Sequence, residues 1–163
     1  MDSLVKKAKM GDPGAFTELM QSQMQNMYKA ARSILHNDED VADAVSETIL
    51  ACWEKMWQLK EETYFRTWMT RILINKCKDI LRKQRNITLM EEVPEVSSRD
   101  SEYENVEWEE ALDSLSEKYR LVMILYYVEG FKTGEISEIL AMQESTVGSR
   151  LASGRQQLVK EFA

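Results

Sequence analysis

Polar and basic side chains recur at helical spacing near the C-terminal end of the chain, a pattern suited to contacting nucleic acid. Hydroxyl and guanidinium groups can donate hydrogen bonds to phosphate oxygens and to base edges in the major groove. The candidates on this face are Thr146, Ser149, Arg150, Ser153, Arg155 and Gln156. Two predicted helices, 134–140 and 144–162, are separated by three residues, the spacing of a helix-turn-helix. A plain helical hairpin with a solvated polar face fits this spacing equally well.

A basic segment in the middle of the chain is the second candidate. Residues 66–85 hold seven basic side chains and one acidic side chain, and Arg71, Lys78, Arg82 and Arg85 recur at helical intervals. Trp57, Tyr64, Phe65 and Trp68 cluster at its start. Cations that follow a backbone, with aromatic rings that stack on bases, suit single-stranded nucleic acid. Aromatic residues at helical spacing are more often core residues, and for Trp68 we favour a place in the core.

Acidic side chains line one side of the helix predicted before this segment. Asp40, Asp43 and Glu47 are three or four residues apart, a spacing that could hold a hard cation. A solvated face, or one that meets a basic partner, is the better interpretation, because His36 is the sole histidine and no Glu-x-x-His pair is present. No nucleophile and base are grouped, and no glycine-rich phosphate loop is present. We therefore expect no catalysis, no cofactor and no metal.

The charge is unevenly distributed along the 163 residues. The net charge is −7, yet residues 86–117 alone hold eleven acidic residues and one basic residue. The rest of the chain is therefore slightly basic. Because phosphate attraction depends on local charge and decays over a Debye length, an acidic protein with a basic segment can still bind a polyanion.

The elements that position these residues are all predicted to be helices, since only two prolines and six glycines are present. Asp12 and Pro13 read as a helix start, Asp38 as the cap of a second helix, and Phe65 as the start of a third that runs to about Arg85. Ser116 begins a helix through Val128 that Gly130 stops. We predict an all-α fold of two small domains, 1–85 and 105–163, joined by a flexible acidic linker, 86–104.

Two cysteines and the N-terminal residues bear on the compartment. Cys52 and Cys77 sit in apolar patterns without CxxC spacing, which favours buried thiols over a disulfide or zinc site. The N-terminal residues lack the apolar segment of a secretory signal, and no apolar run is long enough to span a membrane. We expect a cytoplasmic protein.

Several long motifs resemble the extracytoplasmic-function (ECF) group of bacterial RNA polymerase sigma factors. GDPGAFTELM (11–20), DEDVADAVSETILACWEKMW (38–57) and YFRTWMTRILINKCKDILRKQR (64–85) resemble sigma domain 2, a bundle of three to four helices. ALDSLSEKYRLVMILYYVEGFKTGEISEIL (111–140) and STVGSRLASGRQQL (145–158) resemble sigma domain 4, a helix-turn-helix. The resemblance covers nearly the whole chain in order.

This resemblance implies roles for the candidate residues. Asp40, Asp43 and Glu47 match positions that meet the β′ clamp of core RNA polymerase. The set implied for −10 recognition and melting is Tyr64, Trp68, Arg71, Asn75, Lys78 and Arg82, with the loop 59–64. The set implied for the −35 element is Thr146, Ser149, Arg150, Ser153 and Arg155, on a domain that also meets the β flap. Promoter DNA and an anti-sigma factor are the other implied partners.

The sequence departs from the family pattern at several positions. A lysine or arginine is usual where Gly148 stands, and a bulky residue followed by a basic one is usual at Ala152 and Ser153. The family's common proline is Ser116, its turn glycine is Ala141, and the usual glutamine before Glu47 is Ser46. Fewer phosphate contacts predict weak −35 binding in isolation, which assembly on polymerase can offset.

The leading hypothesis is an alternative sigma factor that binds core polymerase and directs promoter-specific transcription initiation. One alternative is a sigma-like decoy that binds an anti-sigma factor without initiating, suggested by the depleted recognition helix. Another is an ordinary helix-turn-helix repressor, which would not need the domain resembled by 11–85. The acidic linker has two interpretations, a solvated tether and a nucleic-acid mimic in the polymerase channel, and the tether is favoured.

Overall fold

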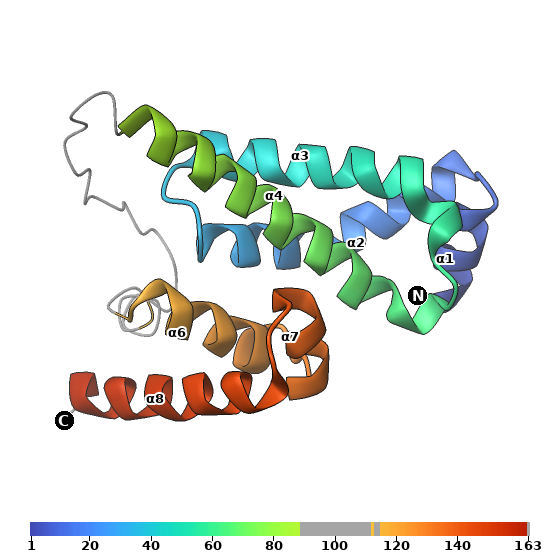
Figure 1. Ribbon diagram of the computed structural model, residues 1–163. Helices are drawn as coiled ribbons and strands as arrows, with labels where there is room; N and C mark the ends of the chain where they lie inside the picture. The colour runs from blue at the N-terminus through green and yellow to red at the C-terminus, as the bar shows by residue number, and fades with distance from the viewer. Residues whose placement is uncertain (89–111, 113–114, 163) are drawn as a thin grey trace.

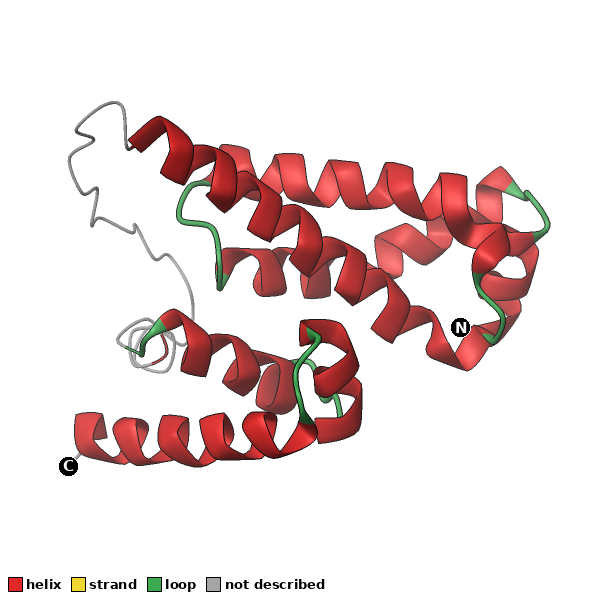
Figure 2. Ribbon diagram, in the orientation of Figure 1, coloured by secondary structure: helices red, strands yellow, loops and turns green. Residues whose placement is uncertain are grey.

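The computed structural model describes residues 1–88, 112 and 115–162, which form two helical units (Figures 1 and 2). Among these residues there is no strand, as the all-α prediction requires. Most of the predicted linker lies outside the described residues. The sequence also favours a short amphipathic helix at 106–115, and most of that segment lies outside them as well. Figure 1 shows the first unit, in blue to green, above the second, in yellow to red.

The first unit is built from four α-helices and two short 3-10 turns. In chain order the elements are α1 (Asp2–Lys9), α2 (Pro13–Arg32), α3 (Asp38–Lys55), η1 (Met56–Gln58), η2 (Glu62–Tyr64) and α4 (Phe65–Thr88). Helix α4 packs along α3 and also touches α2, while α1 packs on α2. The predicted loop 59–64 is thus partly a 3-10 turn that leads directly into α4.

Local sequence explains most of the boundaries in this unit. The Asp12 carboxylate accepts a hydrogen bond from the Ala15 N–H at 3.2 Å, and Pro13 occupies the first helical turn, as predicted. Helix α3 corrects one expectation: its cap is Asn37, whose side-chain oxygen accepts from the Asp40 N–H at 2.8 Å. Asp38 instead lies in the first turn, where its negative charge interacts favourably with the positive end of the helix dipole.

Helix α1 was not predicted from the sequence. Its apolar signal is short, because only Val5 and Ala8 are buried in an eight-residue lysine-bearing segment. Packing against α2 stabilises a helix that its own sequence would leave marginal. Trp53 is a second difference. Its helical spacing with Ile49 and Met56 predicts an inward ring, yet the side chain is 43% exposed and its ring lies 5.0 Å from that of Phe16 in an edge arrangement.

The core of the first unit is formed where α2, α3 and α4 face one another. Phe65, Leu73 and Ile74 of α4 are almost completely buried, as are Leu19 and Met27 of α2. Both cysteines belong to this core, as predicted. Burial raises the pKa of the Cys52 and Cys77 thiols to about 12, so neither is reactive at neutral pH.

The second unit is built from α6 (Glu117–Met123), one π-helical turn η3 (Ile124–Val128), α7 (Thr133–Leu140) and α8 (Glu144–Phe162). Ser116 holds the N-cap position predicted for it, but its hydroxyl makes no capping hydrogen bond. Gly130 follows η3 with φ of +76°, which suits a residue without Cβ. The Thr133 hydroxyl favours that residue as the cap of α7, but the structure has Lys132 as the cap. The Glu135 carboxylate accepts from the Lys132 N–H at 2.9 Å.

Helices α7 and α8 are joined by the short turn 141–143, as the spacing predicted. Ile136, Ile139 and Leu140 of α7 are buried with Val147 and Leu151 of α8. No helix in the described part of the chain combines the length and the apolar character needed to cross a membrane.

Candidate nucleic-acid interface

One face of α4 and its entry turn carries the residues predicted for single-stranded nucleic acid. Tyr64, Trp68, Arg71, Asn75, Lys78 and Arg82 follow one another at alternating intervals of four and three residues. Such intervals place side chains in one row along a helix. Tyr64, Arg71, Asn75 and Arg82 are exposed, while Trp68 and Lys78 are half-buried. The structure therefore gathers this predicted set into a single stripe, which we call the α4 face.

Trp68 contributes to both the core and the α4 face. Its ring packs against the buried cluster and lies 6.2 Å from the Phe65 ring. The favoured core placement is thus correct for part of the side chain, and the rest remains accessible beside Arg71. An aromatic ring anchored on one side is a rigid platform on which a base can stack.

The ends of the α4 face make polar contacts. The Tyr64 hydroxyl donates to the Glu138 carboxylate of α7 at 2.5 Å, and this hydrogen bond raises the pKa of Tyr64. At the other end Arg82 pairs with Asp79 at 3.4 Å, but both side chains are well exposed. Such a surface pair contributes little stability, so Arg82 stays free to exchange Asp79 for a phosphate.

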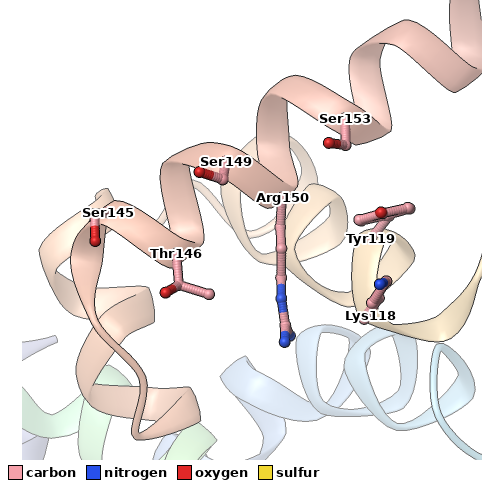
Figure 3. Close-up of a pocket in the computed structure, with 7 residues that line it drawn as sticks. All are labelled: Lys118, Tyr119, Ser145, Thr146, Ser149, Arg150 and Ser153. Carbon is pink, nitrogen blue, oxygen red and sulfur yellow. The ribbon is translucent and has the colours of Figure 1, made fainter.

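A polar groove between α6 and α8 holds most of the second predicted set. Its volume is about 260 Å³ and its lining residues are Lys118, Tyr119, Ser145, Thr146, Ser149, Arg150 and Ser153 (Figure 3). Figure 3 shows Arg150 descending from α8 between Thr146 on one side and Lys118 and Tyr119 on the other. We call this the recognition groove. Two cations and four hydroxyls from serine and threonine give it donors suited to phosphate and base edges.

The structure separates Arg155 from the rest of its predicted set. Its guanidinium donates to the Tyr127 hydroxyl of η3 at 3.1 Å and does not line the recognition groove. Gln156 is exposed but also lies outside the groove lining.

Lys118 and Tyr119 were missed by the sequence analysis. They belong to α6, and Lys118 lies 27 residues upstream of Ser145, so helical periodicity within α8 gave no sign of them. Lys118 supplies the groove with a second cation beside Arg150.

The acidic face of α3 is formed as predicted, with one member turned inward. Asp43 and Glu47 are exposed, whereas Asp40 is half-buried. The Asp40 carboxylate accepts from Asn37 Nδ2 at 2.7 Å and from Gln84 Nε2 of α4. No group of three potential metal ligands occurs among the described residues. Leu50, 61% exposed, lies about one turn beyond Glu47, so an exposed apolar side chain adjoins the acidic face.

Comparison with known proteins identifies the family. Models of sigma-70 region 2 and sigma-70 region 4 match residues 10–87 and 105–158. SigV, an RNA polymerase sigma factor of Bacillus subtilis (strain 168), is 33% identical over 144 residues, covering 84% of this chain and 87% of SigV. The chain belongs to the ECF sigma factors. The ECF sigma factor SigW of the same strain is 26% identical over 177 residues, covering 97% of this chain and 94% of SigW.

A solved structure extends this relationship to the fold. CnrH, solved in complex with the cytosolic domain of CnrY, superposes with a TM-score of 0.76 at 25% identity, covering 99% of this chain and 96% of CnrH. This sigma factor therefore directs promoter-specific transcription initiation with core RNA polymerase. The match to region 4 favours a helix-turn-helix for α7 and α8 over a plain helical hairpin.

Proposed function

We propose that this sigma factor contacts promoter DNA through two separate surfaces and docks on polymerase through a third. The α4 face holds the single strand of the −10 element, the recognition groove reads the −35 element, and the acidic face of α3 meets the β′ clamp. In this proposal the first unit corresponds to residues 1–85 and the second to 105–163. The chain supplies specificity to a cytoplasmic polymerase and no catalysis of its own.

The observation that carries the proposal is the single row formed by the α4 face. A strand separated from its partner presents both a phosphate backbone and unstacked bases. Arg71, Lys78 and Arg82 can follow the backbone, and Trp68 and Tyr64 can stack on bases. Asn75 lies midway along the row and can hydrogen-bond to a base edge.

The recognition groove supports the second part of the proposal. Ser149 and Arg150 stand at family positions that read the −35 element, and the groove brings Lys118 close to them. Since Lys118 and Arg150 come from different helices, a phosphate bound between them fixes the orientation of α8 on the duplex.

The acidic face of α3 supports the docking surface. Asp43 and Glu47 present exposed negative charge, and the neighbouring Leu50 offers apolar area that a partner can bury. A partner with matching basic and apolar groups would bind such a face rapidly because opposite potentials steer the encounter.

An anti-sigma factor is the proposed regulatory partner. CnrH was solved with the cytosolic domain of CnrY bound, so a relative of similar fold accepts a second polypeptide. We propose that a partner of this class holds the present sigma factor away from polymerase.

Transcription by purified core polymerase tests the proposal. Adding this chain to core enzyme and genomic DNA fragments should yield transcripts whose mapped starts share a −35 and −10 pair at fixed spacing. Arg71→Ala with Asn75→Ala should lower transcript yield strongly, while Gln21→Ala on the exposed side of α2 serves as the matched control. A DNA-binding assay is run beside the transcription assay: neither transcript nor DNA binding would favour the decoy, and duplex binding without polymerase would favour the repressor.

A further inference from the structure

The two units are joined by direct contacts between the C-terminal unit and the start of α4. The Tyr64 hydroxyl donates to Glu138 at 2.5 Å, and the Thr67 hydroxyl donates to Glu135 at 3.2 Å. Both glutamates belong to α7, and α7 packs directly against α4. The contact therefore begins at the N-terminal end of the α4 face.

Arg66 forms the centre of this contact. Its guanidinium donates to the Glu129 backbone carbonyl at 2.9 Å and lies 3.7 Å from the Glu129 carboxylate. The same guanidinium stacks over the Phe131 ring, 4.6 Å from its centroid. A third link lies farther away, where the buried Arg120 of α6 donates to the Ser33 carbonyl at the end of α2 at 2.9 Å.

The second unit presents carboxyl groups to hydrogen-bond donors of the first unit, as a nucleic acid would present phosphates. The first unit contributes a tyrosine, an arginine and a threonine as donors, and the second unit contributes three glutamate side chains. Arg71 also lies close enough to Tyr64 to lower its pKa, although the opposing effect of Glu138 is larger. The Glu135 and Glu138 carboxylates thus lie at the end of the α4 face where phosphates of a bound strand would lie.

We propose that this contact is autoinhibitory. When the chain is not bound to polymerase, the contact keeps the two units together, and the glutamates of the C-terminal unit cover the start of the α4 face. The inference rests on the proposed function of that face. Opening the contact releases the Tyr64 hydroxyl from Glu138 and frees the recognition groove to move toward a distant −35 element. None of the polar contacts found between the units in the described part of the chain involves the acidic face of α3, so polymerase can engage that face before the chain opens.

Paired fluorophores test the closed arrangement in the full chain. Thr63→Cys and Gln143→Cys place thiols at exposed positions that flank the contact, and the unreactive Cys52 and Cys77 leave labelling specific. We expect strong energy transfer in the otherwise native chain. Glu138→Lys removes the acceptor of the Tyr64 hydroxyl and places a cation near Arg71, so it should lower the transfer.

Binding of a fluorescein-labelled single-stranded oligothymidine tests whether closure inhibits. We expect Glu138→Lys to bind about fivefold more tightly than the native chain, since one hydrogen bond typically shifts an equilibrium by that factor. Glu117→Lys is the matched control, because it makes the same charge change at an exposed residue of the same unit. It should leave energy transfer unchanged and raise affinity less.

Two outcomes would overturn the proposal. One is energy transfer that Glu138→Lys leaves unaltered, and the other is an affinity gain that is absent or no larger than that of Glu117→Lys. If circular dichroism shows that Glu138→Lys loses helix, Glu138→Ala takes its place with the same expected direction. Neither measurement uses polymerase, so a failure to initiate transcription would reject the proposed function without altering this result.

Discussion

Single residues in the second unit carry backbone and charge features that set its properties. Ala141 adopts a left-handed conformation, with φ of 54° and ψ of 48°, at the position where the family commonly has glycine. Gly148 is an exposed residue in the first half of α8, with open space where a Cβ would stand and Arg150 two residues away. For substitutions at both positions, the direction of the effect on stability or on DNA binding can be predicted.

Replacing Ala141 with glycine should stabilise the protein. A left-handed alanine costs about 1–2 kcal/mol relative to the helical region, and glycine avoids most of this cost while losing some backbone entropy. Ala141→Gly should therefore raise the free energy of unfolding in urea by roughly 0.5–1 kcal/mol. The same substitution at the helical Ala152 should instead lower it by about 1 kcal/mol. A change of the same sign in the free energy of unfolding for Ala141→Gly and Ala152→Gly would contradict this prediction.

Replacing Gly148 with lysine should strengthen DNA binding. The new cation would extend from α8 beside the recognition groove and restore the charge that the family usually has there. A plot of log affinity against log salt for −35 duplex DNA should steepen by about one unit. Val159→Lys adds the same charge about three turns farther along α8 and should leave the slope nearly unchanged. Equal slopes for the two variants would show that Gly148 is remote from phosphate.

At the scale of elements, helix spacing inside the second unit depends on a close approach of α8 to α6. A Cβ at Gly154 would lie 2.9 Å from Met123 Cγ and 3.1 Å from its sulfur. Met123 is only 1% exposed, so its side chain has little room to move. The glycine is therefore required by packing and not by backbone conformation.

Alanine at Gly154 and Gly148 should have opposite effects. In an open helix position, glycine to alanine gains about 1 kcal/mol, which we expect for Gly148→Ala. At Gly154 overpacking costs about 1–3 kcal/mol and outweighs that gain, so Gly154→Ala should lower the free energy of unfolding. Urea unfolding followed by circular dichroism compares the two. If alanine stabilised the protein at both sites, α6 and α8 would be able to move apart without a loss of stability, and the packing argument would be wrong.

At the scale of the whole molecule, Glu129 lies at the contact between the two units and makes the stability of the protein depend on pH. Its side chain is 3% exposed, and burial raises its pKa to about 7 despite the attraction of Arg66 and Lys29. These two cations come from α4 and α2 of the first unit. One carboxylate oxygen, Oε1, is buried without a hydrogen-bond partner among the described residues, which favours the protonated form.

Stability should therefore fall as pH rises from about 4.5 to 7. In this window the folded state binds the Glu129 proton while the unfolded state has released it, so deprotonation favours unfolding. The full difference is roughly 3 kcal/mol at one pKa unit per 1.36 kcal/mol. Glu129→Gln mimics the protonated group, and its unfolding free energy should lose this part of the pH dependence. Parallel pH profiles for the two proteins would contradict the assignment.

The sequence alone determined the features that depend on neighbours in the chain. Asp12 and Pro13 begin α2 because a cap and a restrained φ act within one turn, and Gly130 ends η3 for the same local reason. The α4 face could be predicted because intervals of three and four residues fix a row on any helix. The buried thiols followed from the apolar periodicity around them, and the long motifs pointed to the family.

Tertiary structure decided what depends on residues far apart in the chain. Periodicity predicts which face a helix buries but not which helix covers that face. The place of Lys118 in the recognition groove and the hydrogen bond from Arg155 to the Tyr127 hydroxyl therefore could not be predicted. The burial of Glu129 and the pairing of α7 glutamates with the start of α4 arise only when the two units meet. Those contacts join groups more than 60 residues apart, and their energies depend on distance and desolvation, which a linear sequence does not contain.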